Sequence, residues 1–202
     1  MMKSIGITGG VGSGKSELLS HIRDKYRCKI ILSDLLAKEL QEKGKPCYGP
    51  LVTLLGTEIL DENGNIRKDK MAEKIFSDEV LLTKVNEIIH PAVVKAIVDD
   101  MDESKKSGCF DFFFVEAALL IETGFDKICD ELWYIYTNEN VRRERLKASR
   151  GYSDEKINGI IASQLPEETF RKYCKVVIDN SGNLTDSKKQ VDEILEAYLC
   201  QT

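Results

Sequence analysis

A glycine-rich segment between Gly9 and Ser16 constrains this chain more than any other feature. It reads Gly-Gly-Val-Gly-Ser-Gly-Lys-Ser, with four residues between Gly9 and the Gly-Lys-Ser triplet. This is the pattern of a P-loop, in which successive backbone N–H groups turn inward around a phosphate. An apolar run precedes the segment and a helical pattern follows it, as such a loop requires. A merely flexible glycine-rich turn is the alternative, and this context disfavours it.

The loop chemistry predicts a site for a nucleoside triphosphate and a metal ion. The Lys15 ammonium is expected to reach the β- and γ-phosphates, and the Ser16 hydroxyl to ligate Mg²⁺. The expected nucleotide-binding residues of the loop are Gly10, Val11, Gly12, Ser13, Gly14, Lys15 and Ser16.

Five apolar runs predict an α/β fold with a mostly parallel five-stranded sheet. Helical patterns lie between the runs, so we expect a P-loop core with helices on both faces of the sheet. The nearly continuous hydrophobicity of residues 112–115 is typical of a central strand buried on both sides. The expected strands are residues 4–8, 29–32, 110–115, 132–136 and 176–178.

The uneven spacing of the strands predicts two helical insertions in a single chain of 202 residues. Residues 35–109 are expected to form a helical acceptor-binding region, although a packing extension is the alternative. Residues 139–174 are expected to form a helical lid. The nucleotide-binding core would then consist of residues 1–34, 110–138 and 175–202.

Composition and net charge indicate which kinds of binding partner this protein can have. A net charge of -5 argues against a broad nucleic-acid surface, but it allows a local basic pocket for a phosphorylated small molecule. No apolar run approaches the roughly 20 residues that span a bilayer, so we expect no membrane partner. The six cysteines are scattered without a Cys-x-x-Cys pair, which indicates a reducing cytoplasm. The oligomeric state is not fixed by the sequence, and we favour a monomer.

Acidic residues after two of the strands are candidates for chemistry. Asp34 follows the second strand, where it can deprotonate an acceptor hydroxyl or cap the next helix. Glu116 follows the third strand at the Walker B position, so it is either a Mg²⁺ ligand, usually through water, or an exposed end-of-strand acid. Glu122 lies near enough to line the same cleft.

His90 precedes Pro91, and this dipeptide predicts a break between two helices.

Five basic residues of the lid region fall on two helical stripes. Arg143, Lys147 and Arg150 share one stripe, and Arg142 and Arg145 share the other. A solvated helix face is one interpretation of this charge run. The P-loop favours the other, in which a mobile segment delivers arginines to the transferring phosphoryl group.

The ordered set of motifs resembles the dephospho-coenzyme A kinase family nearly from end to end. The family implies an ATP- and Mg²⁺-dependent transferase that phosphorylates dephospho-coenzyme A, the last step of coenzyme A biosynthesis. The matching segments are 6–16, Ser33-Asp34, Gly64-Asn65-Ile66, His90-Pro91, Leu119-Leu120-Ile121-Glu122, Gln164 and 178–182.

The resemblance also implies roles for individual residues. Asp34 would be the general base, and Asn180 and Gly182 would flank the adenine, although a plain turn at this position is also possible. The acceptor side would be lined by His90, Leu119 and Glu122.

The chain departs from the family pattern mainly in the lid. Ser149 stands where the family usually has an arginine, and Ile160 replaces another. We therefore expect Arg145 or Arg150 to act as the phosphate clamp. Leu32 replaces the first aspartate of the family's Asp-Ala-Asp and leaves Asp34 in place. Two rivals remain open: a kinase of another small acceptor such as a nucleotide, and a non-catalytic protein that binds ATP or coenzyme A.

Overall fold

The fold centres on a five-stranded parallel sheet with the strand order β2-β3-β1-β4-β5. The computed structural model describes residues 2–76 and 78–200. All five predicted strands are confirmed, and so is the α/β fold class. The strands are β1 (Lys3–Thr8), β2 (Cys28–Leu32), β3 (Phe112–Glu116), β4 (Glu131–Tyr136) and β5 (Val176–Asp179).

The central strand β1 pairs with β3 on one side and with β4 on the other. Ile7 is in register with Glu116 of β3 and with Trp133 of β4. The apolar run of β3 is fully buried, as its composition predicts. Because the carboxyl ends of parallel strands meet at one edge, the loop after β1 and Glu116 lie at that same edge.

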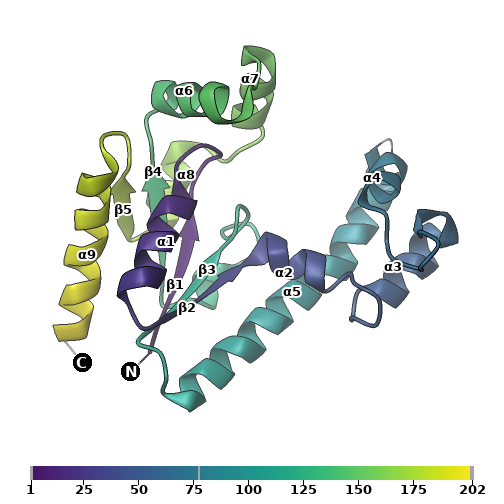
Figure 1. Ribbon diagram of the computed structural model, residues 1–202, viewed down its shortest axis with the longest axis horizontal. Helices are drawn as coiled ribbons and strands as arrows, with labels where there is room; N and C mark the ends of the chain where they lie inside the picture. Colours follow the sequence, from purple (N-terminus) through teal and green to yellow (C-terminus); the bar gives the residue numbers. More distant parts are fainter. Residues whose placement is uncertain (1, 77, 201–202) are drawn as a thin grey trace. The chain divides into compact units, whose positions relative to one another are not determined.

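The described residues form two compact units, one of residues 2–31 and 103–200 and the other of residues 32–76 and 78–102. In the first unit, α1 and α9 are drawn in front of the sheet and α8 behind it (Figure 1). Phe170 of α8 stacks on Tyr134 of β4 with ring centroids 4.8 Å apart. The helices of this unit are α1 (Lys15–Lys25), η2 (Phe125–Lys127), α6 (Glu139–Arg150), α7 (Asp154–Ala162), α8 (Glu167–Tyr173) and α9 (Leu184–Cys200).

The second unit is helical, with a core of buried aliphatic side chains that includes Leu51, Leu55 and Ile59. Its turn at 61–65 is stabilised by the Asp61 carboxylate, which accepts hydrogen bonds from two backbone N–H groups of the turn. The elements are α2 (Ser33–Glu39), α3 (Tyr48–Leu55), η1 (Thr57–Ile59), α4 (Lys68–Phe76) and α5 (Glu79–Ser107), whose last residues belong to the first unit.

The predicted helix break at His90 is wrong, because α5 continues through Pro91. Val85, Val93 and Ile97 are buried at helical spacing on both sides of the proline, whereas Pro91 itself is exposed. Burying these side chains contributes more free energy than the one backbone hydrogen bond that a proline cannot donate. No helix among residues 2–76 and 78–200 is both long and apolar enough to cross a membrane.

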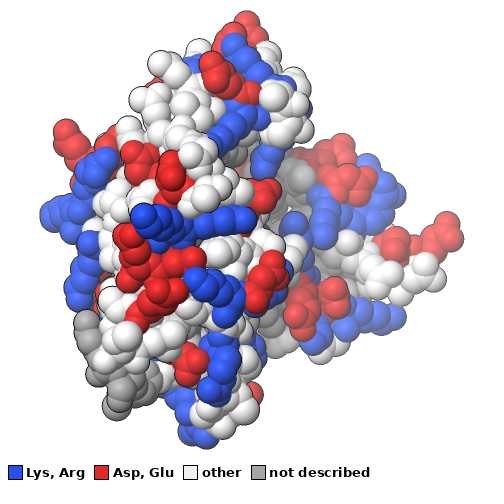
Figure 2. All heavy atoms as spheres, turned by 60° about the vertical axis from the view of Figure 1, so that its left-hand side comes forward, with Lys and Arg blue, Asp and Glu red and all other residues white. Residues whose placement is uncertain are grey.

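Charged side chains of both signs are interspersed over the face drawn in Figure 2. Recognition of an anion on such a face depends on local geometry, because a mixed surface produces no broad positive field.

Replacing Pro91 with alanine should raise the free energy of unfolding by about 1–2 kcal/mol, because alanine restores a helical N–H donor and favours the helix. Urea unfolding followed by far-ultraviolet circular dichroism measures the change. Pro166→Ala is the matched control, since Pro166 is the N-cap of α8, where no helical hydrogen bond is lost. Equal or lower stability of the Pro91→Ala protein would contradict the explanation.

Candidate active site

The loop between β1 and α1 wraps around the ammonium of Lys15. Its Nζ donates a hydrogen bond to the Gly9 carbonyl oxygen at 2.7 Å. Gly14 begins the turn into α1 with φ of 83°, and a Cβ there would meet the Asn180 side chain at 2.4 Å. Only glycine combines this backbone geometry with so close a neighbour. The predicted strand–loop–helix geometry of the P-loop is therefore present.

Two side chains from the ends of other strands hold the loop in place. The Ser13 carbonyl oxygen accepts hydrogen bonds from Asn180 Nδ2 at 2.7 Å and from Thr137 Oγ1 at 3.1 Å. Asn180 is 2% exposed, and its Oδ1 accepts a hydrogen bond from Ser187 at 2.8 Å. Because β1, β4 and β5 are neighbours, these contacts fix the loop to the sheet edge.

Two buried hydroxyls of this region have no hydrogen-bond partner among the described residues. They are Thr8 Oγ1, at the end of β1, and Ser13 Oγ, inside the loop. Unpaired buried polar atoms are costly, so their presence here fits a loop built to receive a polar ligand.

The residues predicted to hold a metal ion belong to the same edge. Glu116 Oε1 lies 3.7 Å from Lys15 Nζ, and the hydroxyl-bearing Ser16 is exposed in the first turn of α1. Within the described ranges no cluster of three or more histidine, cysteine or acidic residues could cage a metal. One hydroxyl and one carboxylate fit Mg²⁺, which is usually bound by few protein ligands together with phosphates and water.

Helix α6, in the region predicted to form a lid, packs directly on the loop through Arg142. Its Nε donates to the Val11 carbonyl oxygen at 3.0 Å, and a terminal nitrogen donates to Gln164 Oε1 at 2.5 Å. A Cβ on Gly10 would meet this guanidinium at 2.4 Å. Burial lowers the pKa of Arg142 from its ordinary value, although an arginine remains protonated at neutral pH.

The two stripes of basic residues on α6 face different partners. Arg145 donates to the Asn180 carbonyl oxygen at 2.9 Å, next to the loop. Lys147 of the other stripe pairs with Asp154 of α7 at 2.7 Å. Arg150 is exposed, and its guanidinium lies 5.9 Å from the ring centroid of Tyr152. The sequence analysis selected Arg145 and Arg150 as the phosphate clamp and did not select Arg142. The helical stripe that Arg142 shares with Arg145 could have indicated it.

Four predicted acceptor-side residues are placed in two different units. Leu119 and Glu122 are exposed on the turn that follows β3 in the first unit. Asp34 is exposed in the first turn of α2, and His90 is half-buried within α5, both in the helical unit. The interpretation of Asp34 as a helix cap is wrong, because α2 begins at Ser33 and no side chain caps it. Gly182 faces open space, since a Cβ there would meet no atom of the described residues within 4 Å.

Comparison with known proteins identifies the family. The family model described as dephospho-CoA kinase matches residues 3–186. The chain belongs to the dephospho-CoA kinase family. A family member from Aquifex aeolicus is 38% identical over 196 residues, which cover 96% of this chain and 97% of the relative. The resemblance drawn from the motifs is therefore confirmed, and the chain is a P-loop kinase.

Solved structures agree with this family. A Thermus thermophilus protein matches with a TM-score of 0.79 and 26% identity, covering 97% of each chain. A dephospho-CoA kinase from Campylobacter jejuni shares the fold with a TM-score of 0.74 and 20% identity, covering 100% of both chains. The family's P-loop kinase fold is thus the fold of this chain.

Replacing Asn180 with alanine should lower the free energy of unfolding by about 1–3 kcal/mol, because the buried Ser187 hydroxyl and the Ser13 carbonyl each lose a partner. Denaturant unfolding measures this loss. Asn140→Ala, at an exposed position of α6, is the matched control. Equal stability of the two variants would show that Asn180 does not anchor the loop.

Proposed function

We propose that this chain transfers the γ-phosphoryl group of ATP to the ribose 3′-hydroxyl of dephospho-coenzyme A, giving coenzyme A and ADP. The observation that carries the proposal is the anchored loop around Lys15 in a chain that belongs to this family. The ordered motifs of the acceptor side, from Asp34 to Glu122, support the same acceptor.

The loop residues of the first unit would bind the donor. Lys15 would exchange the Gly9 carbonyl oxygen for oxygens of the β- and γ-phosphates, while the backbone N–H groups of residues 10–16 surround them. Asn180 and Gly182 would lie beside the adenine. Ser16 would ligate Mg²⁺ directly and Glu116 through water. The ion would supply positive charge that offsets the charge of the transferring group.

We assign the phosphate clamp of the lid to Arg142. Its guanidinium lies over Gly10 of the loop and is held there by Val11 and Gln164. The family's usual lid arginines are replaced by Ser149 and Ile160, so the charge has to come from another position. A partly buried cation that is already oriented stabilises developing charge without reorganisation. Arg145 would not contact the phosphates itself and would instead position Asn180 by donating to its carbonyl oxygen.

Asp34 would take the proton of the acceptor hydroxyl as general base. A carboxylate performs this role in phosphoryl transfer mainly by orienting the nucleophile. Leu32, which replaces the family's first aspartate, leaves this carboxylate in place. His90, Leu119 and Glu122 would contact the rest of the acceptor.

A coupled ADP-release assay with ATP, Mg²⁺ and a panel of acceptors tests the function. ADP release that depends on dephospho-coenzyme A, with a product heavier by one phosphoryl group, is the expected result. Release with a nucleotide acceptor instead would contradict the proposed acceptor, and tight ATP binding without release would contradict catalysis.

Arg142→Gln should lower kcat by about 100-fold, because glutamine keeps polar contacts with the loop but removes the charge. Arg150→Gln should leave kcat within about twofold, since Arg150 is exposed and distant from the loop contacts. Steady-state kinetics with both substrates saturating measures the two effects. Equal losses in both variants, or a larger loss for Arg150→Gln, would remove Arg142 as the clamp.

Asp34→Asn should lower kcat by about 10²-fold or more and leave the KM for ATP nearly unchanged, because it removes only the proton acceptor. Asp99→Asn serves as the control, at an exposed site of α5. Near-normal turnover of Asp34→Asn would exclude Asp34 as the base.

A further inference from the structure

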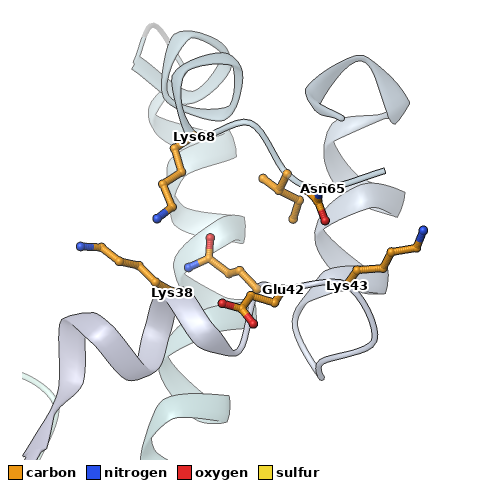
Figure 3. A pocket seen from close by; sticks show the side chains of 7 residues that line it. Lys38, Glu42, Lys43, Asn65 and Lys68 are labelled. Carbon is orange, nitrogen blue, oxygen red and sulfur yellow. The ribbon is translucent and has the colours of Figure 1, made fainter. Parts of the chain in front are cut away.

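The helical unit contains a cavity of about 410 Å³ that the catalytic roles leave unused (Figure 3). It lies between the C-terminal part of α2 with the segment that follows it and the turn that leads into α4. Its lining is unusually basic, with three lysines against one glutamate. The lining residues are Lys38, Gln41, Glu42, Lys43, Asn65, Ile66 and Lys68.

Two of the three lining lysines have no partner in the part of the chain that the structure describes. Within residues 2–76 and 78–200, the structure gives Lys38 and Lys68 no ion pair and no side-chain hydrogen bond. Several other lysines of the helical unit, outside the lining of this cavity, are instead paired with glutamates, and these pairs are Lys45–Glu39, Lys70–Glu73 and Lys74–Glu58.

The side chains in Figure 3 divide the cavity into two sides. The ammonium groups of Lys38 and Lys68 lie on the same side, whereas Lys43 extends away on the other. Lys43 is also occupied, because its Nζ donates to the Asn63 carbonyl oxygen at 3.3 Å. Lys38 and Lys68 therefore form the anion-facing side of the cavity, and we name them the lysine pair.

The walls of the cavity are fixed before any ligand arrives. The Tyr48 hydroxyl donates to the Gly64 carbonyl oxygen at 2.5 Å, which ties the turn to α3. Within the turn, Asn65 donates its backbone N–H to the Asp61 carboxylate at 2.8 Å. Gln41 donates its side-chain amide to the Ala37 carbonyl oxygen at 2.7 Å. A preformed wall reduces the ordering entropy that binding would otherwise cost.

We propose that the lysine pair binds the diphosphate bridge of the acceptor, a subsite that rests on the proposed function. A diphosphate carries two negative charges close together, and two ammonium groups on one cavity wall, neither paired with a described residue, match it. The bridge is not altered by the reaction. Its contacts hold the ground state and the transition state equally, so they act on KM and not on kcat.

Steady-state kinetics on the full chain tests the subsite. Lys38→Gln and Lys68→Gln should each raise the KM for dephospho-coenzyme A by about 10-fold, since each loses one charge-assisted contact. Their kcat should remain within about twofold of the wild type, and so should their KM for ATP. Lys68→Arg should restore most of the affinity because it keeps the charge.

Lys70→Gln is the matched control, because Lys70 lies on α4 but is paired with Glu73 at 2.9 Å. Its KM for dephospho-coenzyme A should equal that of the wild type. An unchanged KM in both variants of the lysine pair, or an equal rise in Lys70→Gln, would overturn the subsite while leaving the proposed function intact.

A second measurement separates the subsite from the proposed function. Inorganic pyrophosphate is titrated into the protein with its P-loop filled by ADP, and backbone amide NMR shifts are followed. Shifts at Gln41, Asn65 and Lys68 that disappear in the Lys38→Gln/Lys68→Gln double variant support the subsite. Absence of these shifts in the wild type overturns it. Failure of dephospho-coenzyme A as an acceptor would sink only the proposed function, and the titration would then decide the anion site alone.

Discussion

The double hydrogen bond to the Ser13 carbonyl is the contact on which the nucleotide site depends. A P-loop binds phosphate with backbone N–H groups, and these converge only if the loop is held in one conformation. Asn180 and Thr137 supply that restraint from the ends of β5 and β4. The strand order therefore determines how the phosphate-binding loop is held, because it places the ends of β1, β4 and β5 next to one another.

The same loop organises the charges around it. Lys15 lies within the loop, Glu116 approaches it from β3, and Arg142 approaches it from α6. Each of these groups is oriented by neighbours before a ligand binds, which is the condition under which charges contribute most to phosphoryl transfer. The proposed phosphate clamp fits this arrangement, since Arg142 lies on the same helix as Ser149 and would supply the charge that Ser149 lacks.

In the helical unit, the proposed anion binding depends instead on lysines that have no partner among the described residues. Several lysines of that unit outside the cavity are paired with glutamates, whereas Lys38 and Lys68 have no such partner among the described residues. An ammonium without a partner keeps its full attraction for an anion, while a paired one has to give up a contact first. On a surface of mixed charge, two such groups on one cavity wall are sufficient to define a local anion site.

Local patterns in the amino-acid sequence were enough to identify the P-loop, the five strands and the family. These patterns are the glycine spacing, the apolar runs and the order of short motifs. The sequence did not show that α5 continues past His90. Pro91 locally favours a helix break, whereas the buried residues on both sides of it stabilise a continuous helix. The sequence also did not select Arg142 among the lid arginines, since helical spacing groups residues on a face without saying what that face meets. Folding brings Val11 and Gln164 to Arg142, and Asn180 to Arg145. Contacts between residues distant in sequence distinguish Arg142 and Arg145 from the exposed Arg150, and local sequence patterns do not contain such contacts.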